Sequence, residues 1–476
     1  MKNIKTLLII FVALFIFMPT NTKAAPANIE FSSGGKINED TYVYAGNNGT
    51  DGSVIMKKLD GTVLWRKDYL NLKINALTVT AEGKIVVVAK KKIIVFDESG
   101  SVVWEKDVTE NLQAIVAEDD GGFTAAGLIN DGVIVRYDKD GNVLDEGVLH
   151  GKNGANFRAI DKTDDGGYIV AGLTYSSDLG IGSTCTSIIA KYDKDLNLLW
   201  NTFWGGNYSD EYSGVATDKD GNYLAVGRTF SSEKLQFSTD GSSDAVIVKY
   251  DKDGNVIWEK IYGGTKNDRF KAINVDENGI TLVAGFSKSP EIIENSGYDS
   301  ILYEIDKDGN VVKEDVLGTN SGDEAYGFIK MSDSVIVLLG LFPEENEYIK
   351  DGSMVFKKSF KVTLETTYTT GVELSSDTVR FEDEVEVLID SSIADKVVVK
   401  IYNASTNKEI TSLVKYDDTT NKFVMPDYDV KVVVSEGIIP PPTGDNVLTY
   451  MILALISVVA ITSILIFSKK ETKSSK

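Results

Sequence analysis

The side chains that most often carry chemistry are scarce in this chain of 476 residues. It contains one His, His150, and one Cys, Cys185. A structural zinc site takes four ligands, and a nucleophilic triad needs a third partner, so this pair can build neither. A lone Cys also excludes an intrachain disulfide framework. The sequence therefore predicts no metal and no cofactor, and it singles out no catalytic residue.

Carboxylates are abundant but not arranged as a catalytic pair. The chain has 71 Asp and Glu against 49 Lys and Arg, a net charge of −22. This balance repels phosphate backbones, so we expect no nucleic-acid partner. Adjacent acids such as Asp119-Asp120 and Asp164-Asp165 stand before Gly-Gly, a pattern typical of a hairpin tip. No general acid and base can be chosen among them.

Phrases reading Asp-Lys-Asp-Gly-Asn begin at Asp138, Asp251 and Asp306 and imitate the opening of a calcium loop. An EF-hand needs a bidentate acid at the twelfth position, where this chain has Leu or Tyr. We expect turn chemistry at these phrases, because Asp and Asn bond to nearby backbone groups and Gly accepts a positive φ. Calcium binding is the alternative.

The tryptophans suggest packing, with one exception. Four of them share one position of a repeat described below: Trp65, Trp104, Trp200 and Trp258. We expect these four rings to pack between repeats. Trp204, whose counterpart in the next repeat is Tyr262, precedes Gly-Gly and is expected near a surface. Trp204 and Tyr262 are therefore the candidate platform for a sugar or peptide ligand.

The N-terminus has the pattern of a secretory signal peptide. Lys2 and Lys5 precede an apolar run over 7–18, and small residues follow up to Ala24. We expect residues 1–24 to be removed, because a dozen apolar residues are too few to span a bilayer comfortably. An uncleaved anchor is the alternative.

The C-terminus has the pattern of a membrane anchor. Residues 447–467 are apolar or small, long enough for a transmembrane helix, and 468–476 form a basic tail. The positive-inside rule places that tail in the cytoplasm and the rest of the chain outside.

A Pro-rich linker over 437–446 precedes this helix and carries Pro440, Pro441, Pro442, Thr443 and Gly444. The order of P-x-T-G motif, apolar helix and basic tail resembles the cell-wall sorting signal of Gram-positive surface proteins. The commonest form of that signal begins with Leu, where this chain has Pro440, a residue that some clostridial sortases accept. The resemblance implies that a sortase cleaves between Thr443 and Gly444 and joins Thr443 to peptidoglycan. A single-pass membrane protein with a Pro-rich linker is the alternative.

Two short phrases alternate through residues 28–360. The first, as in Asp244 to Trp258, has two β-runs around an Asp-Gly turn, and the second, as in Gly214 to Gly227, has the same form. Together they predict about four strands per repeat, which is typical of a propeller blade. The chain opens with a second phrase alone and ends with a first phrase alone at 351–358. We expect these halves to pair as a closing blade, giving about seven blades, with six or eight as alternatives.

The stretches Trp200 to Asp210 and Trp258 to Asp268 resemble the bacterial seven-bladed β-propeller repeat family, whose blades read W-x-x-x-x-G-G-x-x-x-D. The two phrases ending at Trp65 and Trp104 look more like the shorter quinoprotein-type blade. The resemblance implies a fold and no chemistry. Sialidase-like propellers grip a carboxylate with several Arg and carry an S-x-D-x-G-x-T-W box. Arg is scarce here and that box is absent.

Residues 361–436 alternate as strands and close with Phe423-Val-Met-Pro426. This pattern resembles the small Ig-like β-sandwich modules of Gram-positive surface proteins, which usually act as spacers. The sequence thus predicts an all-β protein, with a propeller followed by a small sandwich, between a signal peptide and a membrane helix.

We interpret the protein as a non-enzymatic adhesion module, extracellular and anchored to the cell wall, with a glycan or protein ligand. Its other expected partners are sortase, peptidoglycan and, through the C-terminal helix, the membrane. The alternatives are an extracellular enzyme acting on polysaccharide or peptide, and a membrane-retained sensor or scaffold with its N-terminus outside.

Overall fold

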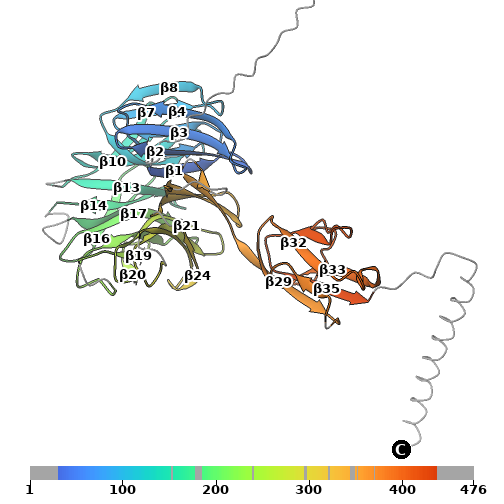
Figure 1. The fold of residues 1–476 in the computed structure, drawn as a ribbon. Coiled ribbons are helices and arrows are strands. Elements are labelled where there is room, and N and C mark those ends of the chain that lie inside the picture. The colour runs from blue at the N-terminus through green and yellow to red at the C-terminus, as the bar shows by residue number, and fades with distance from the viewer. Residues whose placement is uncertain are drawn as a thin grey trace, which may run out of the picture. The chain divides into compact units, whose positions relative to one another are not determined.

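The computed structural model describes residues 30–151, 154–176, 185–237, 241–293, 297–319, 322–343, 349–350, 352–368 and 370–436. The predicted signal peptide at 1–24, the sorting motif at 440–444 and the predicted membrane helix at 447–467 lie outside these ranges. Within them no helix is long and apolar enough to cross a membrane. The chain divides into two compact units, which meet between Phe356 and Lys357 (Figure 1).

The first unit is built of four-stranded antiparallel sheets, of which the described residues form seven. The strands of the first four sheets are β1 (Glu30–Lys36), β2 (Thr41–Asn48), β3 (Asp51–Lys58) and β4 (Val63–Tyr69); β5 (Ile74–Val79), β6 (Ile85–Ala89), β7 (Lys92–Phe96) and β8 (Val102–Asp107); β9 (Asn111–Ala117), β10 (Phe123–Ile129), β11 (Asp131–Tyr137) and β12 (Val143–Leu149); β13 (Ala155–Lys162), β14 (Tyr168–Thr174), β15 (Thr186–Tyr192) and β16 (Leu198–Trp204). The strands of the last three are β17 (Asp210–Thr217), β18 (Tyr223–Thr229), β19 (Asp244–Tyr250) and β20 (Val256–Tyr262); β21 (Asp268–Val275), β22 (Thr281–Ser287), β23 (Asp299–Ile305) and β24 (Val311–Leu317); β25 (Glu324–Lys330), β26 (Val335–Leu341), β27 (Ile349–Lys350) and β28 (Ser353–Lys357).

The sheets stand around a common axis. Each first strand lies against the first strand of the next sheet along the chain, from β1 through β5, β9, β13, β17 and β21 to β25. β25 in turn lies against β1, so the array closes on itself. An arrangement of four-stranded sheets around a central channel is a β-propeller, which confirms the fold class predicted for this part of the chain.

The prediction that the two ends of the chain pair in one closing blade is wrong. Each sheet comes from one continuous segment: the opening phrase, β1 and β2, pairs with the phrase that follows it, and β28 pairs with β26. The connection from Asn48 to Asp51 is a tight turn, so local pairing needs no ring-closing partner. The two ends still meet, because Ser353 lies within hydrogen-bonding distance of the Tyr42 hydroxyl at 3.1 Å.

The Asp-Gly phrases form hairpin turns, as their composition predicted. At the turn between β11 and β12, the Asp138 carboxylate accepts bonds from the backbone N–H of Asp140 at 2.9 Å and of Asn142 at 2.8 Å. Gly141 has a φ of 79°, which a residue with a side chain rarely adopts. Asp251 and Asp306 do the same in their own turns, so these carboxylates hold the backbone.

Each tryptophan at the shared repeat position joins its sheet to the next one. The Trp200 indole N–H donates to the Lys252 carbonyl at 2.9 Å, and its ring packs on Gly254. The same contact to the following turn is made by Trp65, Trp104 and Trp258. This confirms the packing role predicted from the repeat and explains why Gly stands in that turn, since a Cβ would meet the indole.

The second unit has two small sheets around one core. Its strands are β29 (Ser359–Thr366), β30 (Val372–Leu374), β31 (Thr378–Arg380), β32 (Glu384–Ile389), β33 (Val397–Asn403), β34 (Lys422–Val424) and β35 (Val430–Glu436), with a 3-10 helix over Ala394–Lys396. One sheet has the order β31-β29-β35-β33 and the other β30-β32-β34. Val385, Ile401, Phe423 and Val432 from both sheets share one buried cluster. Two sheets facing each other across such a core form a sandwich.

Candidate functional site

Every first strand of the propeller is interrupted by a β-bulge near its start. A bulge places one extra residue opposite its partner strand and turns that side chain in a new direction. The seven extra residues, called the bulge ring below, are Ser32, Asn75, Gln113, Arg158, Ser213, Lys271 and Tyr326. All of them are polar or charged, although apolar residues precede them in the strands. The same irregularity in every sheet therefore presents a polar side chain toward the axis.

A glycine on the second strand lies opposite the bulge in six of the seven described sheets of the propeller. A Cβ built on Gly227 would lie 1.9 Å from the Glu211 carbonyl oxygen, and one on Gly285 would lie 2.0 Å from the Arg269 carbonyl oxygen. The equivalent residue is Gly in six sheets and Ala89 in the second. The Gly that ends the second phrase thus marks the position where the backbone of the first strand approaches most closely.

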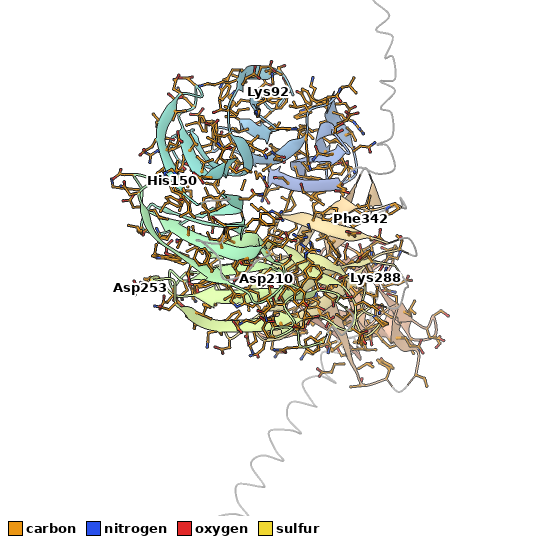
Figure 2. All side chains as sticks on the ribbon, turned by 90° about the vertical axis from the view of Figure 1, so that its left-hand side faces the viewer. Lys92, His150, Asp210, Asp253, Lys288 and Phe342 are labelled. Atoms are coloured by element: carbon orange, nitrogen blue, oxygen red, sulfur yellow. The ribbon has the colours of Figure 1, made fainter. Side chains whose placement is uncertain are left out.

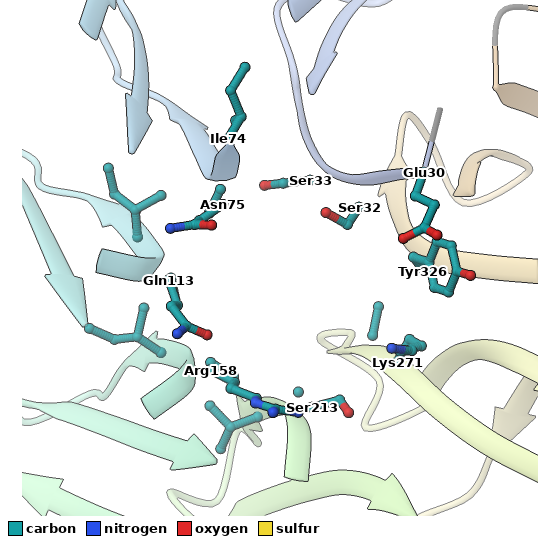
Figure 3. A pocket seen from close by; sticks show the side chains of 18 of the residues that line it. Glu30, Ser32, Ser33, Ile74, Asn75, Gln113, Arg158, Ser213, Lys271 and Tyr326 are labelled. Atoms are coloured by element: carbon teal, nitrogen blue, oxygen red, sulfur yellow. The ribbon is translucent and has the colours of Figure 1, made fainter. Parts of the chain in front are cut away.

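The bulge ring surrounds one cavity of about 590 Å³ on the propeller axis. Figure 3 shows side chains from the separate sheets pointing into it, among them Asn75, Gln113, Arg158 and Lys271. Because the bulges lie in the first four residues of each strand, the cavity opens at the end of the channel where these strands begin.

This mouth lies on the face opposite the acidic turns. Antiparallel strands alternate in direction, so both Asp-Gly turns of a sheet emerge at the end where the first strand finishes. Asp253, on one of these turns, is exposed and lies at the periphery of the unit in Figure 2. The two faces of the propeller therefore differ, with acidic turns on one and the bulge ring on the other.

A group of cations surrounds one carboxylate beside the cavity. The Glu211 carboxylate receives Arg158 at 2.5 Å, Arg228 at 2.6 Å and Arg269 at 2.9 Å. The Glu211 side chain is 9% exposed. Burial alone would raise its pKa, but the attraction of Arg269, Arg158 and Arg228 outweighs burial and lowers it. The carboxylate thus stays ionised and offsets only one of three guanidinium charges.

Arg269 is the most enclosed of these cations. Its side chain is 9% exposed, and it also donates to the Ser213 hydroxyl at 2.7 Å. Its Nε is buried and has no hydrogen-bond partner among the described residues. Burial lowers its pKa to about 10, and the neighbouring Arg228 and Arg158 add repulsion. Positive charge is therefore concentrated here at an electrostatic cost.

Lys271, two residues along the same strand, adds a further cation. Its ammonium lies over the Tyr326 ring, 5.0 Å from the centroid. Among the described residues no carboxylate lies within ion-pair distance of it. Burial, and then repulsion from Arg269, lower the pKa of Lys271 to about 7. The Lys271 side chain is therefore only partly protonated near neutral pH.

The predicted aromatic platform does not offer an exposed face. Trp204 is 4% exposed, stacks on Tyr212 and donates from its indole N–H to Glu259 at 2.5 Å. Tyr262 is half-buried, with its hydroxyl bonded to the Gly309 carbonyl at 2.8 Å. The expectation of a surface position failed because the Gly-Gly that follows Trp204 folds inward, where its second N–H is held by Asp210.

The acids of the sequence motifs serve the backbone. Asp210 is buried and accepts from the Gly206 N–H at 2.8 Å and the Ser231 hydroxyl at 2.8 Å. Burial raises the pKa of Asp210 although these bonds oppose the shift. Asp268 is placed in the same way by Gly264 and Ser289.

His150 and Cys185 are not brought together into a shared site. His150 is exposed and lies 2.9 Å from an Asp131 oxygen. Cys185 is buried as a free thiol. Among the described residues, no group of three His, Cys, Asp or Glu side chains is placed to hold a metal ion.

The cationic site could not be recognised from the number of Arg residues, which was the only property of Arg considered in the sequence. The chain has six Arg, and three of them converge on Glu211. The available signal was positional: immediately before the second phrase, the residue that follows a buried aromatic or aliphatic side chain differs from repeat to repeat, while its neighbours are similar. A variable polar position within a regular repeat marks a residue that does not serve packing.

Comparisons with known proteins agree with a repeat propeller and add little beyond it. A family model described as outer membrane protein assembly factor BamB (PQQ_2) matches residues 50–179. That range contains the second sheet, where the sequence resembled a quinoprotein-type blade. An uncharacterised WD repeat-containing protein, L264, from Acanthamoeba polyphaga mimivirus is 28% identical over 150 residues. The match covers 29% of this chain and 11% of that protein.

Two solved structures match part of the chain at low identity. The WD40 β-propeller domain of Doa1 is 12% identical, with a TM-score of 0.47, covering 70% of this chain and 95% of that one. A protein of unknown function from Bacteroides caccae is 15% identical, with a TM-score of 0.42, covering 61% and 98%.

Proposed function

We propose that this protein is a non-enzymatic binding protein whose ligand enters the propeller channel at the mouth lined by the bulge ring. The observation that carries the proposal is the repeated bulge. Seven separate strands each break their hydrogen-bond ladder at the same point and aim a polar side chain at one cavity. Polar side chains that point into a cavity do not contribute to hydrophobic packing. A shared binding surface therefore explains the seven side chains of the bulge ring best.

The chemistry of the ring favours binding over turnover. Gln113 supplies an amide donor and acceptor, Asn75 an amide oxygen and Ser213 a hydroxyl, from three different sheets. The amide nitrogen of Asn75 already donates to Asn111 and to the Leu112 carbonyl. The carboxylate enclosed among the cations beside the cavity, Glu211, is held ionised by three guanidinium groups and is a poor proton donor or acceptor. The described part of the cavity therefore offers groups that position a ligand. The description of the matched family as an assembly factor is consistent with a binding role and says nothing of this ligand.

Display at the cell surface is part of the same proposal. The signal peptide at 1–24, the motif from Pro440 to Gly444 and the apolar segment at 447–467 support export and covalent attachment to peptidoglycan by a sortase. The sandwich unit would then space the propeller from the wall. Cell fractionation of the parent and of Thr443→Ala tests this. The account expects wall-bound parent and membrane-bound variant, whereas a parent found in the membrane would contradict anchoring.

A glycan array combined with a glycosidase and peptidase screen tests binding against catalysis. We expect retention of a ligand without turnover. Gln113→Ala should abolish retention, because Gln113 lies in the bulge ring, whereas Asn310→Ala, on an acidic turn of the opposite face, should leave it intact. Turnover of any substrate would overturn the non-enzymatic assignment. If Gln113→Ala leaves ligand retention unchanged, the ligand binds outside the bulge ring.

A further inference from the structure

The cavity mouth is positively charged in a strongly acidic protein. Its lining includes four cationic side chains, Lys73, Arg158, Arg269 and Lys271, and one carboxylate, Glu30. The chain as a whole carries a net charge of −22. Cations gathered in a concave site focus the local potential, so this mouth attracts anions although the rest of the surface repels them.

Glu211 does not use up the donors of these cations. It engages Arg158 through one terminal nitrogen, Nη1, and no hydrogen bond from the other Arg158 nitrogens is made within the described residues. Arg158 is 32% exposed, so those donors are accessible from the cavity. Lys271 contributes an ammonium whose described contact is the face of Tyr326. A guanidinium fork and an ammonium without a carboxylate partner are the groups that bind oxyanions in proteins.

The neighbours of these cations indicate what the oxyanion is attached to. Asn75, Gln113 and Ser213 stand around the same cavity and bond to hydroxyl or amide groups. The lining also includes five branched apolar residues, Ile74, Ile115, Ile160, Val215 and Ile273. A ligand that fits is hydroxylated and carries a carboxylate, sulfate or phosphate group.

Resting on the proposed function, we infer that the bulge ring recognises the oxyanion of an acidic saccharide, with Arg158 and Lys271 as the residues that contact it. Glu211 acts as a built-in anion that keeps Arg228 and Arg269 in place. Removing its charge should free donors for the ligand. If the cations served only to hold Glu211, none of the anions would bind at this site.

The test is isothermal titration of the purified protein with glucuronate, sulfate and inorganic phosphate, with glucose as the neutral probe. We expect at least one anion to bind and glucose to bind far more weakly. Arg158→Gln should raise the dissociation constant by about tenfold or more, since a hydrogen bond to a charged group is worth roughly 1.5–3 kcal/mol. Arg66→Gln, which removes the same charge from an outer strand, should leave the dissociation constant unchanged.

A second variant keeps the test valid if Arg158→Gln unfolds. Lys271→Met removes a charge that has no carboxylate partner in ion-pair range, so the fold should survive while anion binding falls. Glu211→Gln should tighten anion binding. Titration with no heat from any of the three anions overturns the oxyanion inference, and binding unaffected by both cation variants does so too. If the array retains a neutral glycan in that case, the proposed binding function stands and only the oxyanion inference is overturned.

Discussion

At the scale of single residues, the site depends on glycines as much as on charges. The bulge that exposes Ser213 requires close approach of the Glu211 carbonyl to Gly227. In the second sheet Ala89 occupies the equivalent position, so the requirement differs between sheets. The Gly that ends the second phrase is thus a structural signature of the bulge ring in six of the seven described sheets of the propeller.

Gly227→Ala should distort the bulge and destabilise the propeller. A Cβ 1.9 Å from a carbonyl oxygen forces the backbone apart, and overpacking of this kind costs about 1–3 kcal/mol. Chemical denaturation followed by tryptophan fluorescence measures the change. Ala89→Gly is the matched control and should cost about 1 kcal/mol, since it adds backbone freedom and removes one buried methyl group without crowding a neighbour. Equal losses in both variants would show that crowding is not the cause.

Lys271 should make stability depend on pH in a defined direction. The charges that act on it are Arg269 on its own strand, Glu211 and Arg228 on the neighbouring fifth sheet, and Arg158 on the fourth sheet. Its ammonium also lies over the ring of Tyr326 on β25. Its pKa is lowered to about 7 in the fold, chiefly by burial, from an ordinary value near 10 in the unfolded chain. Between these values the unfolded state holds more protons, so this residue makes stability rise as pH increases from about 7 to about 10.

Lys271→Met should therefore be more stable than the parent below pH 7, where the buried charge is fully present. The gain should be of order 1 kcal/mol, moderated by partial solvent access, and should shrink toward pH 10. Thermal unfolding of both proteins across this range measures it. A parent-to-variant difference that does not change with pH would contradict the assigned titration.

Residue-level prediction from the sequence succeeded where local geometry decides. The turn role of Asp138 follows from Asp and Gly chemistry, and the packing role of Trp200 follows from its fixed place in the repeat. The surface position predicted for Trp204 was wrong, and Arg158 was not singled out, because the environment of both residues is set by strands distant in sequence. No local pattern places Arg158 beside Glu211.

At the scale of elements, the contact between a tryptophan and the next turn joins neighbouring sheets. Trp200 donates to the Lys252 carbonyl and packs on Gly254, which has a φ of 84°. The repeat thus encodes both the hairpin and its attachment to the next hairpin. Because the pairing signal lies within each phrase, the strand pairs could be predicted from the sequence. The last sheet could not, because we expected strands from the two chain ends to pair, whereas each end pairs with the phrase adjacent to it.

Trp200→Phe should weaken the attachment between the fourth and fifth sheets. It removes the indole hydrogen bond and part of the ring contact, and should cost about 1–2 kcal/mol. Urea denaturation measures the loss. Tyr208→Phe, at an exposed tyrosine, should have no measurable effect. An unchanged free energy of unfolding in Trp200→Phe would show that the indole hydrogen bond does not hold the sheets together.

At the scale of the whole molecule, stability rests on closure of the ring. β1 lies against β25, and Gly352 packs against the Phe31 ring. A propeller that lacks its last sheet exposes both flanking faces. Ring closure was foreseen from the repeat count, although the detail of which strands meet was not.

Truncation should separate closure from the second unit. A chain that ends after residue 358 loses the sandwich and should keep the unfolding midpoint of the propeller. A chain that ends after residue 319 loses the last sheet as well and should unfold at a lower temperature or aggregate. Calorimetry of both measures this. Equal midpoints would mean that closure contributes nothing.

We propose that the channel mouth, lined by the bulge ring, binds an anionic ligand. A crystal structure of the protein grown with glucuronate is the decisive measurement. We expect the carboxylate between Arg158 and Lys271, with the sugar hydroxyls on Gln113 and Asn75. Glucuronate bound only to surface lysines, or an empty channel with Arg158 and Lys271 turned away from the axis, would contradict it.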